Sequence, residues 1–558
     1  MKRAHSIVFG LFLAWAARGA AAEGIVLPAA APAGERPAAS QPGDAAAPQP
    51  QPAADPAGAP DPATASVPAA ADVPAAAPVP AAAAVDAIAP VPAVGAADPD
   101  AVVQATAGPP STVPAPPPGE GLAQPAAASS LPGASEPLAL APARPPFWRD
   151  PVTVSVTESV AIHFIIMKWN KWVGEAEWAE ITWDSVGANL QSAWVLDDDQ
   201  FWVNQFGHPY QGTWSYTAAR SAGLGFWTSS LYPFFSSLAW EYSGETLPPA
   251  INDQITTTVA GISLGEVLLR TSDGLWARGD LGSRVFSVVL APMSAINRGW
   301  VGPRPARPLP SMRLLATAGG LGGDPGKDQW LEPGKGVPFG GLQVVYGVPA
   351  DPDLRLDGPF DHFVFDASYG LTADPVSTMR IRGLIAGEPL APAPDLRGLW
   401  GLYLTFSIDS PGPFRTSGSG LAVGTSLHWQ LQDGLALEGS AVGTAVLLGA
   451  AGQIPSVGGA GRDYRFGPGA EGLLEAELLS RHWRVGGTVR PFYLYGVGEG
   501  EGTEARLDLA AHVMARLGRE HGAGVDVTRM LRWSQDPGGP VATDAATVLR
   551  VFYAYDLR

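Results

Sequence analysis

The strongest constraint on this fold is a two-residue alternation that runs through the C-terminal half of the chain. In the segment 421–432 the odd positions are mostly apolar, as at Leu421 and Val423, whereas the even positions are small or polar. Successive side chains of a strand point to opposite faces, so this pattern predicts strands with one apolar face. Asp433-Gly434 follows, which is a favoured hairpin turn, and the alternation then resumes.

The same alternation recurs along the chain and predicts roughly ten to twelve antiparallel strands, many of them long enough to cross a bilayer at the usual tilt. Strands of a soluble β-sandwich also alternate, so the pattern alone leaves two architectures open. Further segments of this kind are 363–369, 402–409, 483–495 and 506–513.

Three features favour a membrane barrel over a sandwich. The polar faces carry charges of both signs, as a polar lumen does, and aromatic residues such as Tyr493 and Tyr495 gather near strand ends. The last segment has an apolar, aromatic-rich face that resembles the signal read by the outer-membrane assembly machinery, although Arg558 stands where an aromatic residue is usual. We therefore expect an outer-membrane β-barrel over residues 306–558.

The first residues predict export. Lys2 and Arg3 precede an apolar run over 7–17, and a small-residue site, Ala20 to Ala22, ends a signal peptide of residues 1–22. The apolar run is too short for a membrane anchor, which needs roughly 20 residues. We therefore expect a secreted protein of a Gram-negative bacterium. The chain has no Cys, which excludes disulfides, a lipid anchor on cysteine and cysteine chemistry.

Residues 23–146 consist mainly of Ala and Pro, which predicts a disordered tether with polyproline II character. The net charge of −18 argues against nucleic acid as a partner. The partners expected from the barrel are outer-membrane lipids and the barrel assembly machinery. The sequence leaves the oligomeric state open.

The segment 147–305 is predicted to form a helical subdomain, because apolar residues recur three or four apart. Pro233 is expected to kink or break one helix, and Asn252-Asp253 is expected to cap another. The expected helices cover 158–171, 175–190, 210–240 and 256–269.

Several ordered motifs in this helical segment are similar to the domain-of-unknown-function 3943 family of bacterial envelope proteins. The resemblance implies an exported, envelope-associated protein with a barrel following, and it carries over no catalytic residue because the family has no established activity. The motifs are Asn204 to Gly212, Ala218 to Ser221, Trp240 to Glu245, Ile251 to Asp253, Pro292-Met293 and Asn297-Arg298, with Thr257, Gly261, Gly265 and Glu266 between them.

The same segment holds the candidate catalytic residues. Carboxylates held together at low dielectric acquire separated pKa values, and beside a histidine they can act as acid and base. A structural interpretation competes with this one: Arg220 pairs with a carboxylate, Asn252 or Asp253 caps a helix, and Gly261 and Gly265 allow close helix packing. The candidate catalytic set is His208, Glu241, Glu245, Asp253 and Glu266.

The sequence therefore predicts an α+β protein, a helical subdomain followed by an antiparallel transmembrane barrel. The leading function is structural or channel-like, with the helices capping or plugging the lumen. The alternative is a hydrolase or acyl-chain modifier acting on envelope lipids, and a soluble periplasmic binding module ranks third. No cofactor and no metal site is predicted, and metal binding by the helical polar residues ranks below the structural and the catalytic interpretation. The acidic run 197–199 could attract a cation such as calcium, but it lacks the calcium-loop pattern, so a solvated turn is the preferred interpretation.

Overall fold

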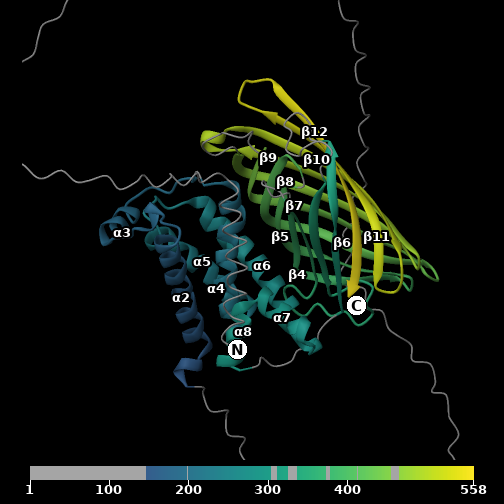
Figure 1. The fold of residues 1–558 in the computed structure, drawn as a ribbon, viewed down its shortest axis with the longest axis horizontal. Helices are drawn as coiled ribbons and strands as arrows, with labels where there is room; N and C mark the ends of the chain where they lie inside the picture. Colours follow the sequence, from purple (N-terminus) through teal and green to yellow (C-terminus); the bar gives the residue numbers. More distant parts are fainter. Residues whose placement is uncertain are drawn as a thin grey trace, which may run out of the picture. The chain divides into compact units, whose positions relative to one another are not determined.

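The computed structural model describes residues 146–557 except for 198, 303–310, 325–335, 372–376, 411 and 454–463. The predicted signal peptide and nearly all of the tether lie outside the described residues. Helices come first along the chain and strands follow (Figure 1). The helices are α2 (Pro151–Trp172), α3 (Trp183–Asn189), α4 (His208–Ala222), α5 (Phe226–Ser243), α6 (Ile251–Arg278), α7 (Leu281–Leu290) and α8 (Pro292–Trp300).

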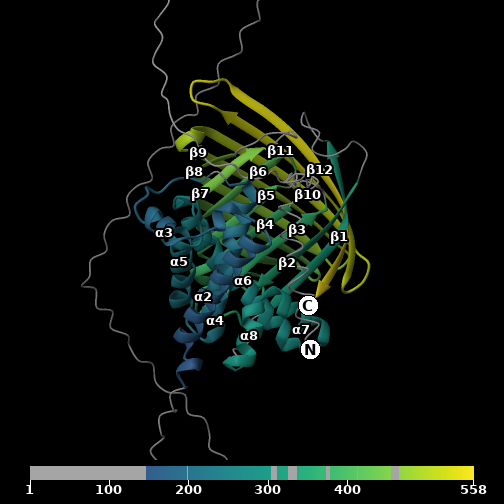
Figure 2. The ribbon, with the colours of Figure 1, turned by 60° about the vertical axis from the view of Figure 1, so that its left-hand side comes forward.

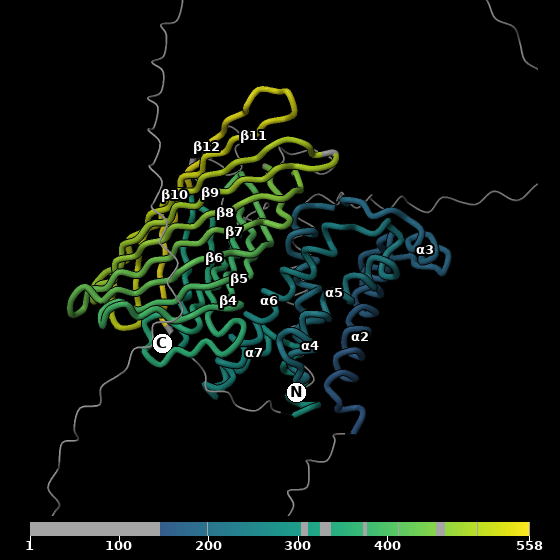
Figure 3. The backbone as a smooth tube through the Cα atoms, turned by 180° about the vertical axis from the view of Figure 1, so that it is seen from behind, coloured from purple at the N-terminus to yellow at the C-terminus, as the bar shows by residue number. Residues whose placement is uncertain are grey.

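The twelve described strands form one closed antiparallel barrel, in which each strand pairs with its sequence neighbours and β1 pairs with β12 (Figure 3). This confirms the predicted barrel and excludes the sandwich. The strands are β1 (Met312–Asp324), β2 (Val337–Tyr346), β3 (Phe363–Gly370), β4 (Ser377–Ala393), β5 (Leu396–Ser410), β6 (Phe414–Gln432), β7 (Leu435–Gln453), β8 (Tyr464–Ser480), β9 (Trp483–Gly496), β10 (Gly502–Arg516), β11 (His521–Gln535) and β12 (Val541–Leu557).

The alternation of each strand separates a lumen face from an outer face. Asp366 and Ser368 of β3 line the cavity inside the barrel, so Phe363 and Phe365, which precede Asp366 by odd numbers of residues, point outward. The predicted hairpin joins β6 to β7 through Gly434, whose φ of 77° lies in the left-handed region that glycine adopts without strain.

A row of outward side chains crosses seven neighbouring strands at directly paired positions, and we call it the apolar row. It is buried because α6 covers it: Leu264, Val267 and Leu268 of α6 belong to the same core cluster as its apolar members. The helices thus pack against the outer face of the barrel wall (Figure 2). The members, each paired with the next, are Leu314, Val344, Phe365, Ile381, Phe406, Ser419 and Leu448.

This packing does not confirm the prediction that the helices plug the lumen. Among the described residues, part of the connection between β2 and β3 (residues 347–362) packs against the inner face of the wall. Its Leu354 and Leu356 pack against a cluster of inward-pointing side chains that includes Leu384, Leu399 and Tyr403.

Two helix predictions are corrected. The helix expected over 210–240 is two helices, because Gly223 adopts φ 116° and ends α4, whereas Pro233 lies inside α5 without ending it. The helix expected over 175–190 is reduced to one short turn at Glu177–Ala179 and to α3.

The predicted cap of α6 is also corrected. Asn252 and Asp253 lie in the first turn of α6, and the N-cap position is Ala250. Since Ala250 has no polar side chain, the start of the helix is stabilised differently. The backbone N–H of Ala250 donates to Oε2 of Glu241 at 2.7 Å, so a carboxylate from α5 caps the start of α6.

Among the described helices, α2 is long and apolar enough to cross a membrane, judged by length and composition. Its large apolar side chains are mostly exposed, with Val160 63 % and Trp172 68 % accessible. The face of α2 toward α4 is the buried one and contains Val154 and Ile162.

Candidate functional site

Six ionisable residues form a polar cluster among the helices, which we call the acidic centre. His208 begins α4, directly after a single π-helical turn at Val203–Gly207, and Pro209 is tolerated there because the first turn needs no N–H donor. The imidazole Nε2 of His208 lies 3.6 Å from Oδ2 of Asp253 in α6. The members of the acidic centre are Asp197, Asp199, His208, Glu241, Glu245 and Asp253.

Two fully buried asparagines hold the aspartates in place. Asn252 donates to Oδ1 of Asp253 at 2.8 Å and to Oδ1 of Asp197 at 3.3 Å. The backbone N–H of Asp197 donates in return to Oδ1 of Asn252 at 3.0 Å. Asn204 donates to Oδ1 of Asp197 at 2.6 Å, so this carboxylate is fixed by both amides.

The barrel also supports this centre. Tyr464, at the start of β8, donates its hydroxyl to the carbonyl oxygen of Asp199 at 2.6 Å. The same hydroxyl accepts a hydrogen bond from Asn204 at 2.9 Å. The acidic centre is therefore tied to the barrel through one tyrosine.

The two glutamates belong to the end of α5 and the turn after it. Asn189 donates to the backbone carbonyl oxygens of Glu241 and Glu245, at 3.2 and 3.0 Å, and so fixes this turn. Glu241 and Glu245 are 1 % and 9 % exposed, which places both carboxyls in a poorly solvated position.

Burial and mutual repulsion perturb the titration of these groups. Burial raises the pKa of Glu241 to about 7, against the hydrogen bond from Ala250. Burial, followed by the charge of Glu241, raises the pKa of Glu245 to about 9. Burial and then the charges of Asp197 and Glu241 raise the pKa of Asp253 well above its usual range.

Burial lowers the pKa of His208, and the charge of Asp197 opposes this effect. Near neutral pH the centre thus combines a neutral imidazole with carboxyls that retain protons. Such a combination can exchange protons, and its carboxylates and imidazole nitrogen can also ligate a cation.

Glu266, the fifth candidate catalytic residue, lies elsewhere. Asp253 and Glu266 are both on α6, and thirteen residues of helix separate them by about 20 Å. Arg220 binds both carboxylate oxygens of Glu266 at 2.8 Å, Arg270 binds Oε1 at 2.7 Å, and Tyr216 donates at 2.7 Å. This saturated carboxylate has a structural role, as expected if Arg220 pairs with an acid.

Arg270 extends the network to the barrel. Its guanidinium donates to Oδ1 of Asp361 at 2.8 Å and to the carbonyl oxygen of Pro359 at 2.7 Å, both in the β2–β3 connection. Among the described residues, the helical segment therefore makes polar bonds to Tyr464, Asp361 and Ser417, in addition to its contact with the apolar row.

The glycines named from the sequence lie where α4 and α6 meet. A Cβ on Gly261 would lie 2.8 Å from the backbone carbon of Gly212, and one on Gly265 would lie 2.6 Å from the ring of Tyr216. Any larger residue at these positions would push the two helices apart, and α4 carries His208.

The sequence interpretation left Asp197 and Asp199 out of the candidate catalytic set, because a solvated turn was the preferred interpretation of this acidic run. Asp199 is exposed, but Asp197 is half-buried and bonded to Asn204 and Asn252. A usable signal was present, since both asparagines belong to the motifs quoted for the family resemblance.

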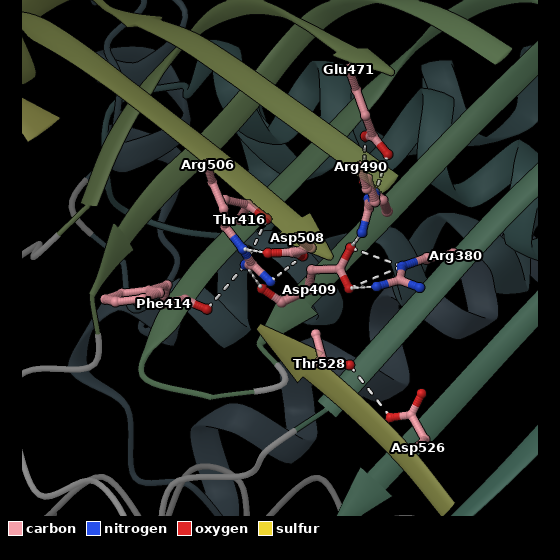
Figure 4. Close-up of polar contacts among 11 residues, drawn as sticks. Arg380, Asp409, Phe414, Thr416, Glu471, Arg490, Arg506, Asp508, Asp526 and Thr528 are labelled. Atoms are coloured by element: carbon pink, nitrogen blue, oxygen red, sulfur yellow. Dashed lines mark hydrogen bonds and ion pairs between the residues drawn. The ribbon is translucent and has the colours of Figure 1, made fainter. Parts of the chain in front are cut away.

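A second polar region fills the barrel lumen (Figure 4). Asp409 of β5 is fully buried and is contacted by arginines from other strands. Arg380 of β4 donates from Nε to both of its carboxylate oxygens at 3.0 Å, and Arg490 of β9 forms an ion pair with it. Arg506 of β10 donates to its backbone carbonyl oxygen at 3.1 Å.

Other contacts join strands that are not neighbours in the barrel. Arg382 of β4 bonds Glu475 of β8 at 3.0 Å, and Arg313 of β1 bonds Glu438 of β7 at 2.9 Å. Bonds of this kind must cross the lumen. A cavity of about 260 Å³ remains between them, and Arg313, Glu438 and Arg382 are among the residues that line it.

Residues 193–294 match the family model described as domain of unknown function (DUF3943), which confirms the resemblance inferred from the motifs. The match contains the acidic centre and leaves the barrel outside. No curated protein matches the chain.

Solved structures of outer-membrane proteins resemble the barrel at low sequence identity. The NanC porin is 7% identical and covers 44% of this chain and 100% of its own, with a TM-score of 0.23. The CymD monoaromatic hydrocarbon channel is 10% identical and covers 45% and 89%, with a TM-score of 0.19. The translocator domain of autotransporter NalP from Neisseria meningitidis is 16% identical and covers 51% and 98%, with a TM-score of 0.20. Similarity at this level assigns no function.

Proposed function

We propose that this protein is an outer-membrane β-barrel with a closed lumen, whose wall anchors the helical domain in the cell envelope. The observation that carries the proposal is the set of ion pairs that join non-neighbouring strands across the lumen: Arg490–Asp409, Arg382–Glu475 and Arg313–Glu438. An open diffusion channel needs a continuous water-filled path, whereas here charged side chains from opposite walls bind one another. The role is therefore that of a scaffold.

The outer surface of the barrel supports a membrane location. Away from the apolar row, outward side chains are apolar and exposed, as at Val423 with 59 %, Leu474 with 58 % and Val551 with 56 % accessible. A closed barrel with this surface satisfies its backbone hydrogen bonds internally, which a bilayer requires. Export by the predicted signal peptide and insertion by the barrel assembly machinery belong to the same proposal.

Membrane fractionation tests the location. We expect the full-length protein in the outer-membrane fraction, with migration on a detergent gel that changes on heating because the barrel unfolds. Recovery of the whole protein from the periplasm would refute a membrane barrel.

Conductance in planar lipid bilayers tests the closed lumen. We expect the full-length protein to give no steady ion current, and the double variant Asp409→Ala/Arg490→Ala to give one, because it removes an ion pair across the lumen. Arg519→Ala is the matched control, since Arg519 is an exposed arginine in the turn between β10 and β11. A steady current through the unmodified protein would show that the lumen is open.

A second candidate function is supported by the acidic centre. His208, Glu241 and Asp253 lie in one buried cluster with opposed pKa shifts, which is an arrangement suited to general acid–base catalysis. The proposed envelope location makes a lipid the expected substrate. Glu266 no longer belongs to this set. This function can be tested by comparing the envelope lipids of three strains: a deletion strain, the same strain complemented with the natural chain, and the same strain complemented with His208→Ala. Identical lipid profiles in all three strains would exclude it.

A further inference from the structure

We propose that the acidic centre binds a divalent transition-metal ion, best matched by Zn²⁺, through His208, Asp197, Asp199 and Asp253. This site is separate from the lumen, so it stands whether or not the barrel conducts ions.

The distances suit a shared ion. One ligand atom each of Asp197, Asp199 and His208 lies within 4.8 Å of the others, and His208 Nε2 is 3.6 Å from Asp253 Oδ2. With metal–ligand bonds of about 2.1 Å, ligand atoms on a tetrahedral ion are about 3.4 Å apart. In any coordination geometry, two such ligand atoms are at most about 4.2 Å apart. The pair His208–Asp253 already has this spacing, and the separations among Asp197, Asp199 and His208 need to shorten by at most about 1.4 Å.

The imidazole is an independent indication of a ligand. His208 is 9 % exposed, and its Nε2 is a buried nitrogen without a hydrogen-bond partner among the described residues. Buried polar atoms are almost always satisfied, so a nitrogen aimed at a group of carboxylates needs an explanation. A cation between His208 and the aspartates supplies one.

The surroundings are those of a metal site rather than of an ion pair. The charged groups that act on Asp253 are Asp197, Glu241 and Glu245, and all of them are acids. Asn204 and Asn252 hold the carboxylates by hydrogen bonds, which is the orienting role that residues behind metal ligands usually have. A bound dication would lower the repulsion among these acids.

The ligand types select the ion. Ca²⁺ and Mg²⁺ take oxygen ligands almost exclusively, whereas an imidazole nitrogen beside carboxylates suits Zn²⁺ and its neighbours in the first transition row. Asp199 is exposed, so the ion can enter from solvent on that side.

Metal binding by the full-length protein, folded in detergent, provides the test. After stripping with chelator, we expect calorimetric titration with Zn²⁺ to give one ion per chain, with Ca²⁺ binding at least tenfold more weakly. Co²⁺ in place of Zn²⁺ is expected to give visible absorption bands that depend on the histidine. A chain that binds no Zn²⁺ stoichiometrically, or binds Ca²⁺ as tightly, would overturn the proposal.

Two variants separate a lost ligand from a lost fold. His208 is buried, so His208→Ala can disturb the folding of α4. Asp199→Asn is therefore included, because an exposed side chain can be changed with little effect on folding. Each is expected to weaken Zn²⁺ binding at least tenfold. Asp184→Asn, an exposed aspartate in α3, is the matched control and should bind as the natural chain does. Unchanged binding by folded Asp199→Asn and His208→Ala would place the ion elsewhere.

Discussion

At the scale of single residues, Glu266 is a buried carboxylate that joins α6 to α4 through Arg220 and Tyr216. It is fully buried and binds two arginines and one tyrosine, so Glu266→Gln leaves Arg220 without its charge partner and leaves Arg270 paired with Asp361 alone. Breaking a buried ion pair in this way costs about 3–5 kcal/mol. We expect the variant to lower the free energy of unfolding by that amount, followed by tryptophan fluorescence in urea.

Asp273 offers the matched control. It binds Arg298 at 2.7 Å but its side chain is 33 % exposed, so water can solvate the arginine when the acid is removed. Asp273→Asn is expected to cost about 1 kcal/mol or less. Equal effects of the two substitutions would show that the Glu266 network is no more important than a surface pair.

The same carboxylate predicts a pH dependence with a definite sign. Burial alone would raise the pKa of Glu266, but Arg220 and Arg270 overcome burial and hold it well below the usual range. A group with a depressed folded-state pKa contributes its stability above its unfolded pKa, about 4.3, and loses it as the pH falls further.

The difference in unfolding free energy between the natural chain and Glu266→Gln measures this contribution. It is expected to be constant from pH 5 upward and to shrink as acid is added, because protonated Glu266 resembles glutamine. A difference that instead grew below pH 5 would contradict the assignment.

At the scale of elements, the contact between α4 and α6 depends on small residues. A Cβ at Gly261 would lie 2.8 and 2.9 Å from backbone atoms of Gly212, which cannot move independently of α4. Gly261→Ala is therefore expected to cost about 1–3 kcal/mol although alanine favours helix, because overpacking outweighs propensity. Thermal unfolding followed by circular dichroism measures the loss.

Gly299→Ala is the matched control, because it is not expected to destabilise the protein as Gly261→Ala does. Gly299 lies inside α8 with nothing within 4 Å of its Cβ position, so alanine there gains helix propensity without a clash. It should be neutral or stabilising by up to about 1 kcal/mol. If both substitutions were harmless, close packing of α4 on α6 would not be what holds this contact.

Elements were predictable where local chemistry decides them. Alternation and Asp433-Gly434 identified β6, β7 and their turn, because strand period and turn geometry are local properties. The sequence did not predict that a helix ends at Gly223. Proline breaks helices more strongly than glycine, so the break was expected at Pro233, but Pro233 lies inside α5 without ending it. The start of α6 was misplaced because its donor is bonded by Glu241, a residue from another helix.

The candidate site was predictable in part for the same reason. His208, Glu241, Glu245 and Asp253 do gather, because the motifs place them near the ends of helices that pack together. Glu266 was wrongly grouped with them, since sequence does not show that its partners are Arg220 and Arg270. The contribution of Asp197 depends on a chain reversal that only the tertiary structure reveals.

At the scale of the whole molecule, the position of the helices could not be deduced from the sequence. Outward side chains that face α6, such as Phe406, have the same apolar character as those expected to face lipid, such as Val423. An apolar outer face is therefore expected whether lipid or a packed helix lies against it, and the alternation does not distinguish these two environments. Only contacts such as those of the apolar row distinguish a flanking helical domain from a plug.

Engineered cysteines can test this arrangement, because the chain has none of its own. Gln205, in the π-helical turn before α4, accepts a hydrogen bond from Ser417 of β6 at 2.5 Å. Thr416, the neighbour of Ser417, points the other way and bonds Arg506 in the lumen at 3.2 Å. The two positions are thus adjacent in sequence but lie on opposite faces of the wall.

We expect a short bis-maleimide to cross-link Gln205→Cys to Ser417→Cys, and to leave the pair Gln205→Cys and Thr416→Cys unlinked. Both double variants are expected to keep the barrel, and heat-modifiable migration serves as the folding control for each. Helices that plugged the lumen would give the reverse pattern, because the turn holding Gln205 would then face Thr416. The two variants differ only in whether the cysteine on β6 points to the outer face or to the lumen. The result therefore depends on which side of the barrel wall the helices occupy.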